Sequence, residues 1–351
     1  MDKIRNSILK YPGGKARELN KFEYLFPSRI DTLVDPFVGG GSVWIGSSAK
    51  KYIINDFSKD LINLYNSIKY NEKLLDLYLN KLDTDLNSIK FDENIIKKIK
   101  NSKNLNEIIE VVKEFANKIK FNFDGIKQEF KNEYPKYVGR KENYIKKNDI
   151  IISEDLIKIM QTSLYASYYN SVRKLYNEAS FENNQMRASA YLYIREFCYS
   201  SMFRFSKSGK FNVPYGGETY NKKDFCSHET FYNSDFLKDK IIKTKIYNYD
   251  FEKFINKLSF SENDFIFLDP PYDTEFSTYD NNKFDKNEQI RLANLLSNLH
   301  VKWMIVIKDS ELIRSLYPID KFRYVDYKNN YSVNFKNRNN KKVNHLVIMN
   351  Y

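Results

Sequence analysis

The sequence contains little of what builds metal centres, disulfide frameworks or membrane spans. Its 351 residues include only two cysteines, Cys198 and Cys226, and they contain no hydrophobic signal or spanning segment, which favours a reducing cytoplasm. The three histidines, His228, His300 and His345, lie far apart and lack the spacing of metal ligands. We therefore expect a cytoplasmic protein that has no metal site and does not enter a membrane.

A dinucleotide fingerprint is also missing. The stretch 35–43 contains Gly39, Gly40 and Gly41, but the third glycine follows the second directly instead of three residues later, which disfavours a nicotinamide enzyme. Apolar residues flank this stretch, as expected for a strand, a glycine turn and a helix in that order. Glycines let a ligand approach the backbone, and a helix start presents free N–H groups, so the turn predicts a nucleotide-like ligand.

An Asp-Pro-Pro-Tyr cluster is the most informative segment of the chain. Asp269, Pro270, Pro271 and Tyr272 follow the apolar run 265–268, which predicts a buried strand. In open α/β sheets ligands bind outside the carboxyl ends of strands, so the cluster is placed for chemistry. Because prolines fix φ and lack N–H donors, we expect the Pro270 and Pro271 carbonyl groups to stay free to accept hydrogen bonds from a planar aromatic amine. The alternative is a simple turn that ends a strand.

Asp56 ends a second short strand, residues 52–55, soon after the glycine turn. An acid in this place typically holds ribose hydroxyl groups. The alternative is structural, because Asp56 or Ser58 could cap the helix predicted over residues 59–65. The two roles are compatible.

The composition favours a polyanionic partner. Lysine and arginine number 57 against 45 acidic residues, so the net charge is +12 and the pI is near 9.2. This charge predicts salt-sensitive binding to nucleic acid. The lysines are spread along the chain, however, and the run 96–100 indicates an amphipathic helix with a solvated face. Aromatic residues make up 16% of the chain, enough for stacking surfaces as well as core.

The chain is long enough to bury a large core and to divide into two domains. We expect residues 1–69 and 241–351 to form one domain and residues 70–240 to form the other. The second domain should contain helices over 70–120, 154–178 and 184–197, whereas the polar segment 132–149 is either a flexible DNA-facing loop or a surface excursion. The elements expected to complete an α/β sheet are a helix over 286–299 and strands over 243–247, 303–307, 322–327 and 343–349.

Five segments carry a family resemblance through their order as well as their residues. They are 9–15 (Leu-Lys-Tyr-Pro-Gly-Gly-Lys), 35–43, Asn55-Asp56, 204–216 and 269–272. In this order they resemble the adenine-specific DNA methyltransferases of the Dam and DpnII type (D12 class, alpha group), in which a target-recognition region separates the cofactor motif from the Asp-Pro-Pro-Tyr motif. The resemblance covers residues 8–66 and 195–275 well and 70–190 hardly at all.

The resemblance implies both a fold and a reaction. The fold would be a Rossmann-like S-adenosylmethionine-dependent methyltransferase sheet with a mostly helical inserted target-recognition domain. The reaction would transfer the methyl group of S-adenosylmethionine to N6 of an adenine that is flipped out of duplex DNA. Asp269 and the Pro270 carbonyl would accept the two amine hydrogens and direct the lone pair toward the methyl group, and Tyr272 would stack on the base. Alignment would supply much of the rate, without a metal or a covalent nucleophile.

A cofactor pocket follows from the same resemblance. Tyr11 and Lys15 would lie near the methionine portion, Asp56 would hold the ribose, and the turn 37–41 would pass under the cofactor. Asp250-Phe251 resembles the adenine-pocket position, although Phe251 also fits an ordinary core position at helical spacing. The predicted cofactor-binding set is Tyr11, Lys15, Asp35, Phe37, Gly39, Gly41, Asp56, Asp250, Phe251 and Asp269.

DNA contacts are expected from Lys10 and from a hairpin near residues 199–217. Tyr199 matches the aromatic residue that enters the space left by the flipped base, and Arg204 and Lys10 match cations that contact the site. Each has a plain alternative: Tyr199 could belong to the core, and Lys10 or Arg204 could contact only phosphates, which position DNA without specifying sequence. The predicted DNA-binding set is Lys10, Tyr199, Arg204, Lys207, Lys210 and Asn212.

The chain departs from the family pattern near its end. Dam-like members usually show Ser-Asn and an acid where this chain has Ile307-Lys308-Asp309, and they commonly carry an acid in the last strand where this chain has Val343-Asn344-His345. With the unmatched middle region, these differences predict a recognition site other than the four-base GATC.

Three other functional classes stay open. They are a cytosine-N4 methyltransferase, which commonly has serine where Asp269 stands, an RNA methyltransferase, and a non-catalytic DNA-binding protein that retains the fold. Our leading interpretation is the modification component of a restriction-modification system. Its expected partners are double-stranded DNA and a restriction endonuclease that acts on the same site, and its expected place is the nucleoid.

Overall fold

The protein divides into two compact units in the computed structural model. The structure describes residues 7–11, 13–70, 72–178, 184–202, 204–271, 278–279, 282–330 and 342–351. The first, which we call the sheet unit, comprises residues 1–69 and 233–351, and the second, the helical unit, comprises residues 70–232. Helix α10 (Asp235–Ile242) belongs to the sheet unit, so the division falls at residue 233 rather than at residue 240.

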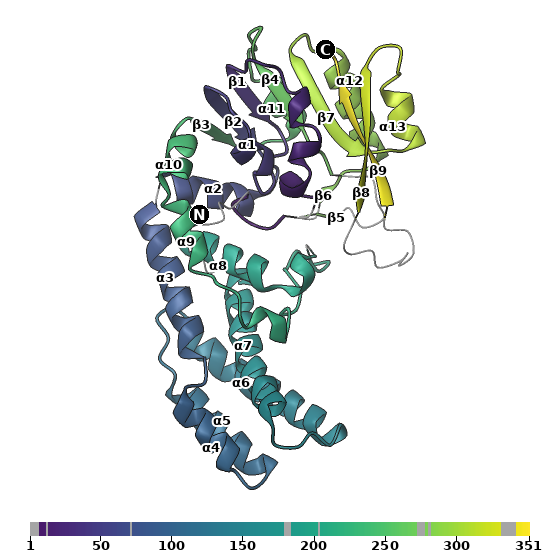
Figure 1. Ribbon diagram of the computed structural model, residues 1–351. Helices are drawn as coiled ribbons and strands as arrows, with labels where there is room; N and C mark the ends of the chain where they lie inside the picture. The colour runs from purple at the N-terminus through teal and green to yellow at the C-terminus, as the bar shows by residue number, and fades with distance from the viewer. Residues whose placement is uncertain are drawn as a thin grey trace. The chain divides into compact units, whose positions relative to one another are not determined.

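The sheet unit is built on a seven-stranded sheet in the order β3-β2-β1-β4-β7-β9-β8 (Figure 1). The first five strands in this order run parallel, and β9 is antiparallel to both of its neighbours. This confirms the expected α/β class. The strands are β1 (Thr32–Asp35), β2 (Lys51–Asn55), β3 (Thr244–Tyr247), β4 (Phe265–Leu268), β7 (Lys302–Lys308), β8 (Arg323–Asn330) and β9 (Lys342–Met349), and a separate two-stranded sheet pairs β5 (Thr278–Tyr279) with β6 (Asn282–Lys283).

The central strands are apolar because they are buried on both faces. All four residues of β4 and the five inner residues of β7 are buried, the pattern of parallel strands that are covered on each side. The helical segments of this unit are η1 (Lys15–Arg17), η2 (Leu19–Lys21), η3 (Glu23–Leu25), α1 (Ser42–Gly46), α2 (Lys59–Tyr70), α10, α11 (Phe251–Ile255), α12 (Lys286–Ser297) and α13 (Glu311–Leu316).

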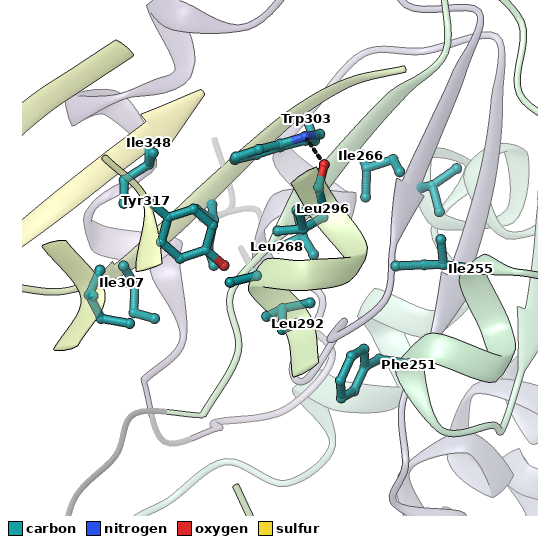
Figure 2. Close-up of a cluster of buried hydrophobic side chains, with 14 of the residues drawn as sticks. Phe251, Ile255, Ile266, Leu268, Leu292, Leu296, Trp303, Ile307, Tyr317 and Ile348 are labelled. Atoms are coloured by element: carbon teal, nitrogen blue, oxygen red, sulfur yellow. Dashed lines mark hydrogen bonds between the residues drawn. The ribbon is translucent and has the colours of Figure 1, made fainter. Parts of the chain in front are cut away.

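A hydrophobic cluster fixes α12 on the sheet (Figure 2). Leu292 and Leu296 of α12 pack in this cluster with Ile266 and Leu268 of β4. The indole N–H of Trp303 donates to the Leu296 carbonyl at 3.1 Å, so a buried polar atom is satisfied within the apolar contact. The position of α12 relative to the end of β4 is therefore set by packing.

The sheet order creates a crevice beside β1. The chain passes from β1 to β2 and β3 on one side, then returns to β4 on the other side of β1 and continues to β7. Such a reversal of strand order leaves an opening at the carboxyl ends of the two strands involved, here β1 and β4. The segments that follow these strands are those that the sequence marked as functional, 35–43 and 269–272.

The helical unit contains long helices and a tyrosine-rich core. Tyr168, Tyr169, Tyr191 and Tyr193 are each at most 1% exposed. None of the helices in the described ranges of the chain combines the length and apolar composition that a membrane crossing requires. The helical segments are α3 (Glu72–Ser88), α4 (Glu93–Asn101), α5 (Leu105–Lys118), α6 (Ile126–Lys147), α7 (Glu154–Asn177), α8 (Asn184–Phe197), η4 (Tyr199–Ser201), η5 (Glu218–Tyr220) and α9 (Ser227–Tyr232).

The expectation of a loop or surface excursion over residues 132–149 is wrong. Nearly all of this segment belongs to α6, which continues through Pro135. Phe130, Tyr134 and Val138 follow one another at four-residue spacing and are buried, so one apolar face holds the helix against its neighbours. The polar residues that suggested a loop occupy its solvated face.

Candidate active site

A cleft lies at the carboxyl ends of the parallel strands in the sheet unit. Its walls are the segments that follow neighbouring strands, with Tyr11 and residues 13–15 from the N-terminal region. Nine residues of the predicted cofactor set line this one cleft, and Gly41 is the exception. The lining segments are 35–40 and 42–43 after β1, 55–58 after β2, 249–251 after β3, and Phe267 and 269–271 at the end of β4.

The glycine turn after β1 depends on left-handed backbone. Gly39 and Gly41 have φ values of 49° and 77°, which other residues rarely adopt. A Cβ atom at Gly41 would lie 2.5 Å from the Tyr65 hydroxyl oxygen, and that hydroxyl donates to the Gly39 carbonyl at 3.0 Å. Gly41 precedes α1 as its N-cap residue. It therefore shapes the cleft from behind rather than lining it.

Asp56 braces the glycine turn. Its Oδ2 accepts from the Gly39 N–H at 3.0 Å and its Oδ1 accepts from the Ser58 N–H at 2.9 Å. The Ser58 hydroxyl accepts from Leu61 N–H at 3.4 Å, so the capping role that we considered for either residue belongs to Ser58. The two oxygens of a carboxylate offer about four lone-pair positions, so a bracing role for Asp56 is compatible with accepting from a ligand hydroxyl.

Asn55 joins the ends of three strands, a role that its sequence context did not reveal. Its side chain is 1% exposed. The amide nitrogen donates to the carbonyl groups of Pro36 and Tyr249 at 3.1 and 3.0 Å, and the amide oxygen accepts from the Tyr249 N–H at 2.8 Å. Asn55 thus holds the segments after β1 and β3 against the end of β2.

Asp35 lies at the bottom of the cleft and is only 2% exposed. Burial raises the pKa of Asp35 well above its usual range; a hydrogen bond from the Phe37 N–H at 3.2 Å opposes the rise, and the charges of Asp269 and Asp56 add to it. Asp56 and Asp269 therefore lie close enough to raise the pKa of Asp35, and a cationic ligand beside these groups would favour their charged forms.

Lys15 contacts Asp269 directly. Its ammonium group lies 2.7 and 2.8 Å from the two carboxylate oxygens and also donates to the Gly13 carbonyl at 2.8 Å. Burial raises the pKa of Asp269, and the charge and hydrogen bond of Lys15 oppose that rise. Because Lys15 is itself 2% exposed, the two ions depend on each other. The structure thus pairs Lys15 with the Asp-Pro-Pro-Tyr carboxylate.

A second polar network lies behind Lys15 and was not predicted. Glu18 Oε2 accepts from the Tyr327 hydroxyl at 2.7 Å and lies 3.2 Å from Nδ1 of His345, which is fully buried. Burial raises the pKa of Glu18, but the bond to His345, the charge of Lys15 and the bond from Tyr327 outweigh it and lower the pKa. Glu18 thus supplies a carboxylate beside the last strand, where residues 343–345 contain none.

The two proline carbonyl groups differ in their partners. The Pro271 carbonyl accepts from the Gln289 side-chain amide at 3.1 Å, so the expectation that it stays free is wrong. Pro270 is buried and lines the cleft, and its carbonyl receives no hydrogen bond from the residues that the structure describes. A ligand donor would therefore find its acceptor at Pro270.

An aromatic wall encloses another part of the cleft. Phe37, Phe251 and Phe284 contact one another with ring centroids 5.6 to 5.7 Å apart. Phe251 is 4% exposed and belongs to the hydrophobic core as well as to the lining, so both of its proposed positions are compatible. Asp250 caps α11 through bonds from Glu252 N–H and Lys253 N–H and pairs with Arg291, whose guanidinium lies 4.4 Å from the Phe251 ring centre.

The predicted hairpin is present in the helical unit. Antiparallel bridges join Cys198 with Tyr215 and Phe205 with Phe211. Tyr199 follows the end of α8 and is 44% exposed, so the alternative that it belongs to the core is wrong. Lys207 and Lys210 are exposed near the hairpin tip.

Arg204 and Asn212 face each other across the hairpin. Arg204 Nε donates to Asn212 Oδ1 at 2.8 Å, and the guanidinium also contacts the Asn212 carbonyl at 3.3 Å. The Arg204 side chain remains exposed. In the sheet unit, Lys10 is exposed next to Tyr11. Tyr272, predicted to stack on the target base, lies outside the described residues.

Comparison with known proteins agrees with this arrangement. The family model described as D12 class N6 adenine-specific DNA methyltransferase matches residues 11–160 and 115–333. The chain is 28% identical over 350 residues to the type II methyltransferase M.CviBI of Paramecium bursaria Chlorella virus NC1A, covering 98% of this chain and 99% of that protein. It is 25% identical to the DNA adenine methylase of Haemophilus influenzae, with 94% and 89% covered, and 23% identical to the type II methyltransferase M1.LlaDCHI of Lactococcus lactis subsp. cremoris, with 91% and 84% covered. The chain belongs to the D12 class of N6 adenine-specific DNA methyltransferases.

Proposed function

We propose that the chain transfers a methyl group from S-adenosylmethionine to N6 of an adenine at a specific site in duplex DNA. The observation that carries this proposal is the pair of acceptors at the end of β4. Asp269 presents a carboxylate, and Pro270 presents a carbonyl that receives no hydrogen bond from the described residues. Both residues line the cleft beside the glycine turn. An exocyclic amine has two hydrogens to donate to such a pair.

The cleft suits S-adenosylmethionine by charge and shape. A cationic ligand would favour the charged forms of the Asp35 and Asp56 carboxyl groups, whereas Asp269 already pairs with Lys15. The wall of Phe37, Phe251 and Phe284 favours a flat aromatic ring. Bound in the cleft, this cofactor would supply an electrophilic methyl group on a sulfonium. Asp56 would hold its ribose, and Tyr11 would cover the glycine turn beneath it. Lys15 would act on Asp269 rather than on the methionine portion.

The protein's contribution to the reaction would be to prepare the amine. The N6 lone pair of adenine is delocalised into the ring, so the amine is a poor nucleophile. Asp269 and the Pro270 carbonyl, by accepting its two hydrogens, would localise the lone pair and stabilise the positive charge that develops on nitrogen. Lys15 would keep Asp269 ionised and oriented, since a protonated carboxyl would lose acceptor capacity. Tyr272 would stack on the flipped base.

The helical unit would supply most of the DNA contacts. The exposed cations Arg204, Lys207 and Lys210 lie on the hairpin with Tyr199, an arrangement that suits the sugar-phosphate backbone and an unstacked base. The type II designation of two relatives supports a role as the modification component of a restriction-modification system. Such a role would have a restriction endonuclease as partner and the nucleoid as place of action.

Locating the transferred methyl group tests the proposal. The full chain is incubated with a library of DNA duplexes, and separately with RNA, in the presence of S-adenosylmethionine that carries a labelled methyl group. DNA binding is measured in parallel, and the products are digested to nucleosides. We expect N6-methyladenine in a fixed sequence context that is different from, or longer than, GATC. N4-methylcytosine, label in RNA alone, or DNA binding without any transfer would each contradict the proposal and identify the alternative.

A further inference from the structure

Gln289 of α12 makes the protein's contact with the carbonyl of Pro271. Its side-chain amide nitrogen lies 3.1 Å from that oxygen, and the residue is 1% exposed. The side-chain oxygen Oε1 is also buried and receives no hydrogen bond from the described part of the chain. One half of this side chain is therefore engaged with the Asp-Pro-Pro-Tyr segment, while the other half is an unpaired acceptor.

A buried unpaired acceptor lowers stability. Methionine has nearly the same length and shape as glutamine and no strong acceptor to desolvate, so it would fill this position at least as well in terms of folding. The amide group has one compensating contact, its bond to the Pro271 carbonyl. The reason for an amide at position 289 therefore lies in its bond to the Pro271 carbonyl rather than in the stability of the core.

The backbone around this contact has few free torsions. The rings of Pro270 and Pro271 fix φ at both positions, so the direction of the carbonyl groups depends mainly on the ψ angles. At one end the segment is fixed by β4 and by the Lys15 contact with Asp269, and at the other end by Gln289. Holding the Pro271 carbonyl restrains these ψ angles and with them the direction of the Pro270 carbonyl.

We propose that Gln289 is a positioning residue for methyl transfer: it occupies the Pro271 carbonyl and so aims the Pro270 carbonyl, the one without a protein donor, at the target amine. This inference rests on the proposed function. It deepens that function by adding a residue that contacts neither the target base nor the cofactor. The packing of α12 on the sheet gives Gln289 a rigid base (Figure 2).

Replacing Gln289 with methionine tests the role. In Gln289→Met the single-turnover methylation rate at saturating cofactor and DNA should fall about tenfold, equivalent to about 1.4 kcal/mol in the barrier. The dissociation constant for S-adenosylmethionine should stay within twofold. The melting temperature should change little, because loss of the bond to the Pro271 carbonyl and removal of the buried unpaired acceptor act in opposite directions. Asn294→Met, at an exposed position of the same helix, is the matched control and should change none of these.

Glutamate at the same position gives a second readout. In Gln289→Glu an ionised carboxylate faces the Pro271 carbonyl without a donor, and the rate should fall at least as far as in the methionine variant. A protonated carboxyl group can donate to that carbonyl. The rate of Gln289→Glu relative to the wild type should therefore recover as the pH is lowered, whereas the relative rate of Gln289→Met should stay constant.

The outcomes separate this inference from the proposed function. A wild type that methylates no adenine removes both. An active wild type whose Gln289→Met variant is less stable but equally fast shows that Gln289 is only a packing residue. If Gln289→Met fails to fold, the Gln289→Glu ratio decides, because a ratio that is independent of pH overturns the positioning role.

Discussion

Left-handed backbone occurs in the glycine turn of the cleft and in the turn that begins the hairpin, but different residues adopt it. In the cleft the residues are Gly39 and Gly41, which accept this conformation without strain. Next to Tyr199 they are Ser200 and Ser201, with φ values of 52° and 51°. A residue with a Cβ atom in this region costs about 1–2 kcal/mol. The cleft turn is thus encoded by its own glycines, whereas the turn at Ser200 and Ser201, which we call the serine turn, needs support from its surroundings.

The support of the serine turn comes from side chains of the helical unit. Arg195 is 1% exposed and donates to the carbonyl groups of Met202 and Ser201 at 2.8 and 3.4 Å. The hydroxyl of Tyr220 accepts from the Ser200 N–H at 3.0 Å. The exposed Tyr199 therefore precedes a strained turn, Ser200 and Ser201, which the buried Arg195 stabilises. The difference from the cleft suggests that the two sites should respond differently to substitution.

The largest effect is expected in the cleft, at Asp269, the carboxylate that we propose to be catalytic. Asp269→Asn should lower the methylation rate by about 10² to 10³-fold, because the amide offers one acceptor fewer and no charge to stabilise the developing cation. Cofactor affinity should change little. Rates are measured under single turnover, with Glu262→Gln, an exposed acid before β4, as the control. A rate within a few-fold of the wild type would remove the proposed role of Asp269.

Asp56→Ala should act on binding rather than on the rate. Loss of a charged hydrogen-bond acceptor for the ribose, together with its brace on Gly39, should weaken S-adenosylmethionine binding by about 1.5–3 kcal/mol. Calorimetry measures this change. Ser58→Ala is the informative control, because it removes the helix cap and leaves the brace. Equal affinities for Asp56→Ala and the wild type would reduce Asp56 to a structural residue.

On the hairpin, Arg204→Ala distinguishes a contact with a base edge, which reads the sequence, from a contact with phosphate, which only positions the DNA. If Arg204 contacts a base edge, the variant should lose about 1–3 kcal/mol of discrimination at one position of the site. A phosphate contact would instead weaken binding evenly across sequences and reduce the salt slope. Affinities for single-base variants of the site at two salt concentrations separate these outcomes. Uniform loss would end the base-reading role.

The network behind Lys15 should show itself in the pH dependence of stability. Glu18→Gln should lower the free energy of unfolding by about 1 kcal/mol at neutral pH, because Tyr327 and His345 keep only a neutral acceptor. The pKa of folded Glu18 lies below its ordinary value of 4.5, so its contribution is complete above that pH and is lost as the pH falls through the folded pKa.

Urea titrations from pH 7 into the acid range test this expectation. The stability gap between the wild type and Glu18→Gln should close below about pH 4.5. The exposed acid in Glu23→Gln should show no such gap. A gap that stays constant into acid would mean that the Glu18 charge contributes nothing.

The smallest expected effect is a gain of stability from a substitution in the serine turn. Ser201→Gly removes left-handed strain and should raise the free energy of unfolding by about 0.5–1 kcal/mol, less than the full strain because glycine also gains freedom in the unfolded chain. The control, Ser208→Gly, changes a serine of the same hairpin that is not left-handed and should not stabilise. Destabilisation by Ser201→Gly would mean that its side chain is required.

The parts of the site that the sequence predicts are those determined by residues that are neighbours along the chain. A strand, a glycine turn and the start of a helix can be recognised from neighbouring residues. The carboxyl ends of parallel strands lie at the same edge of the sheet. Residues 35–43, Asp56 and 269–271 could therefore be assigned to one cleft, because each follows a short apolar run.

Contacts between distant segments could not be predicted in this way. Lys15 and Asp269 are 254 residues apart, and Glu18 and His345 are 327 residues apart, so no local pattern signals either pair. The family resemblance places Lys15 near the methionine portion of the cofactor, and nothing in the motif around Lys15 points to Asp269. Glutamine is an ordinary residue in a helix, so nothing in the sequence marks Gln289. Its role depends on the packing of α12 beside β4, which brings Gln289 to the Pro271 carbonyl.

The pairing of β2 with β3 has a consequence for how the protein folds and for how its helical unit can vary. Tyr52 lies opposite Thr244, although the whole helical unit separates them in the sequence. This edge of the sheet forms only after a very long loop closes, which favours slow folding of the sheet. Loop-closure entropy, however, grows only with the logarithm of length, so doubling the insert would cost about 0.6 kcal/mol. The same two strands can therefore carry inserts of very different size, and the helical unit can change while the sheet stays the same.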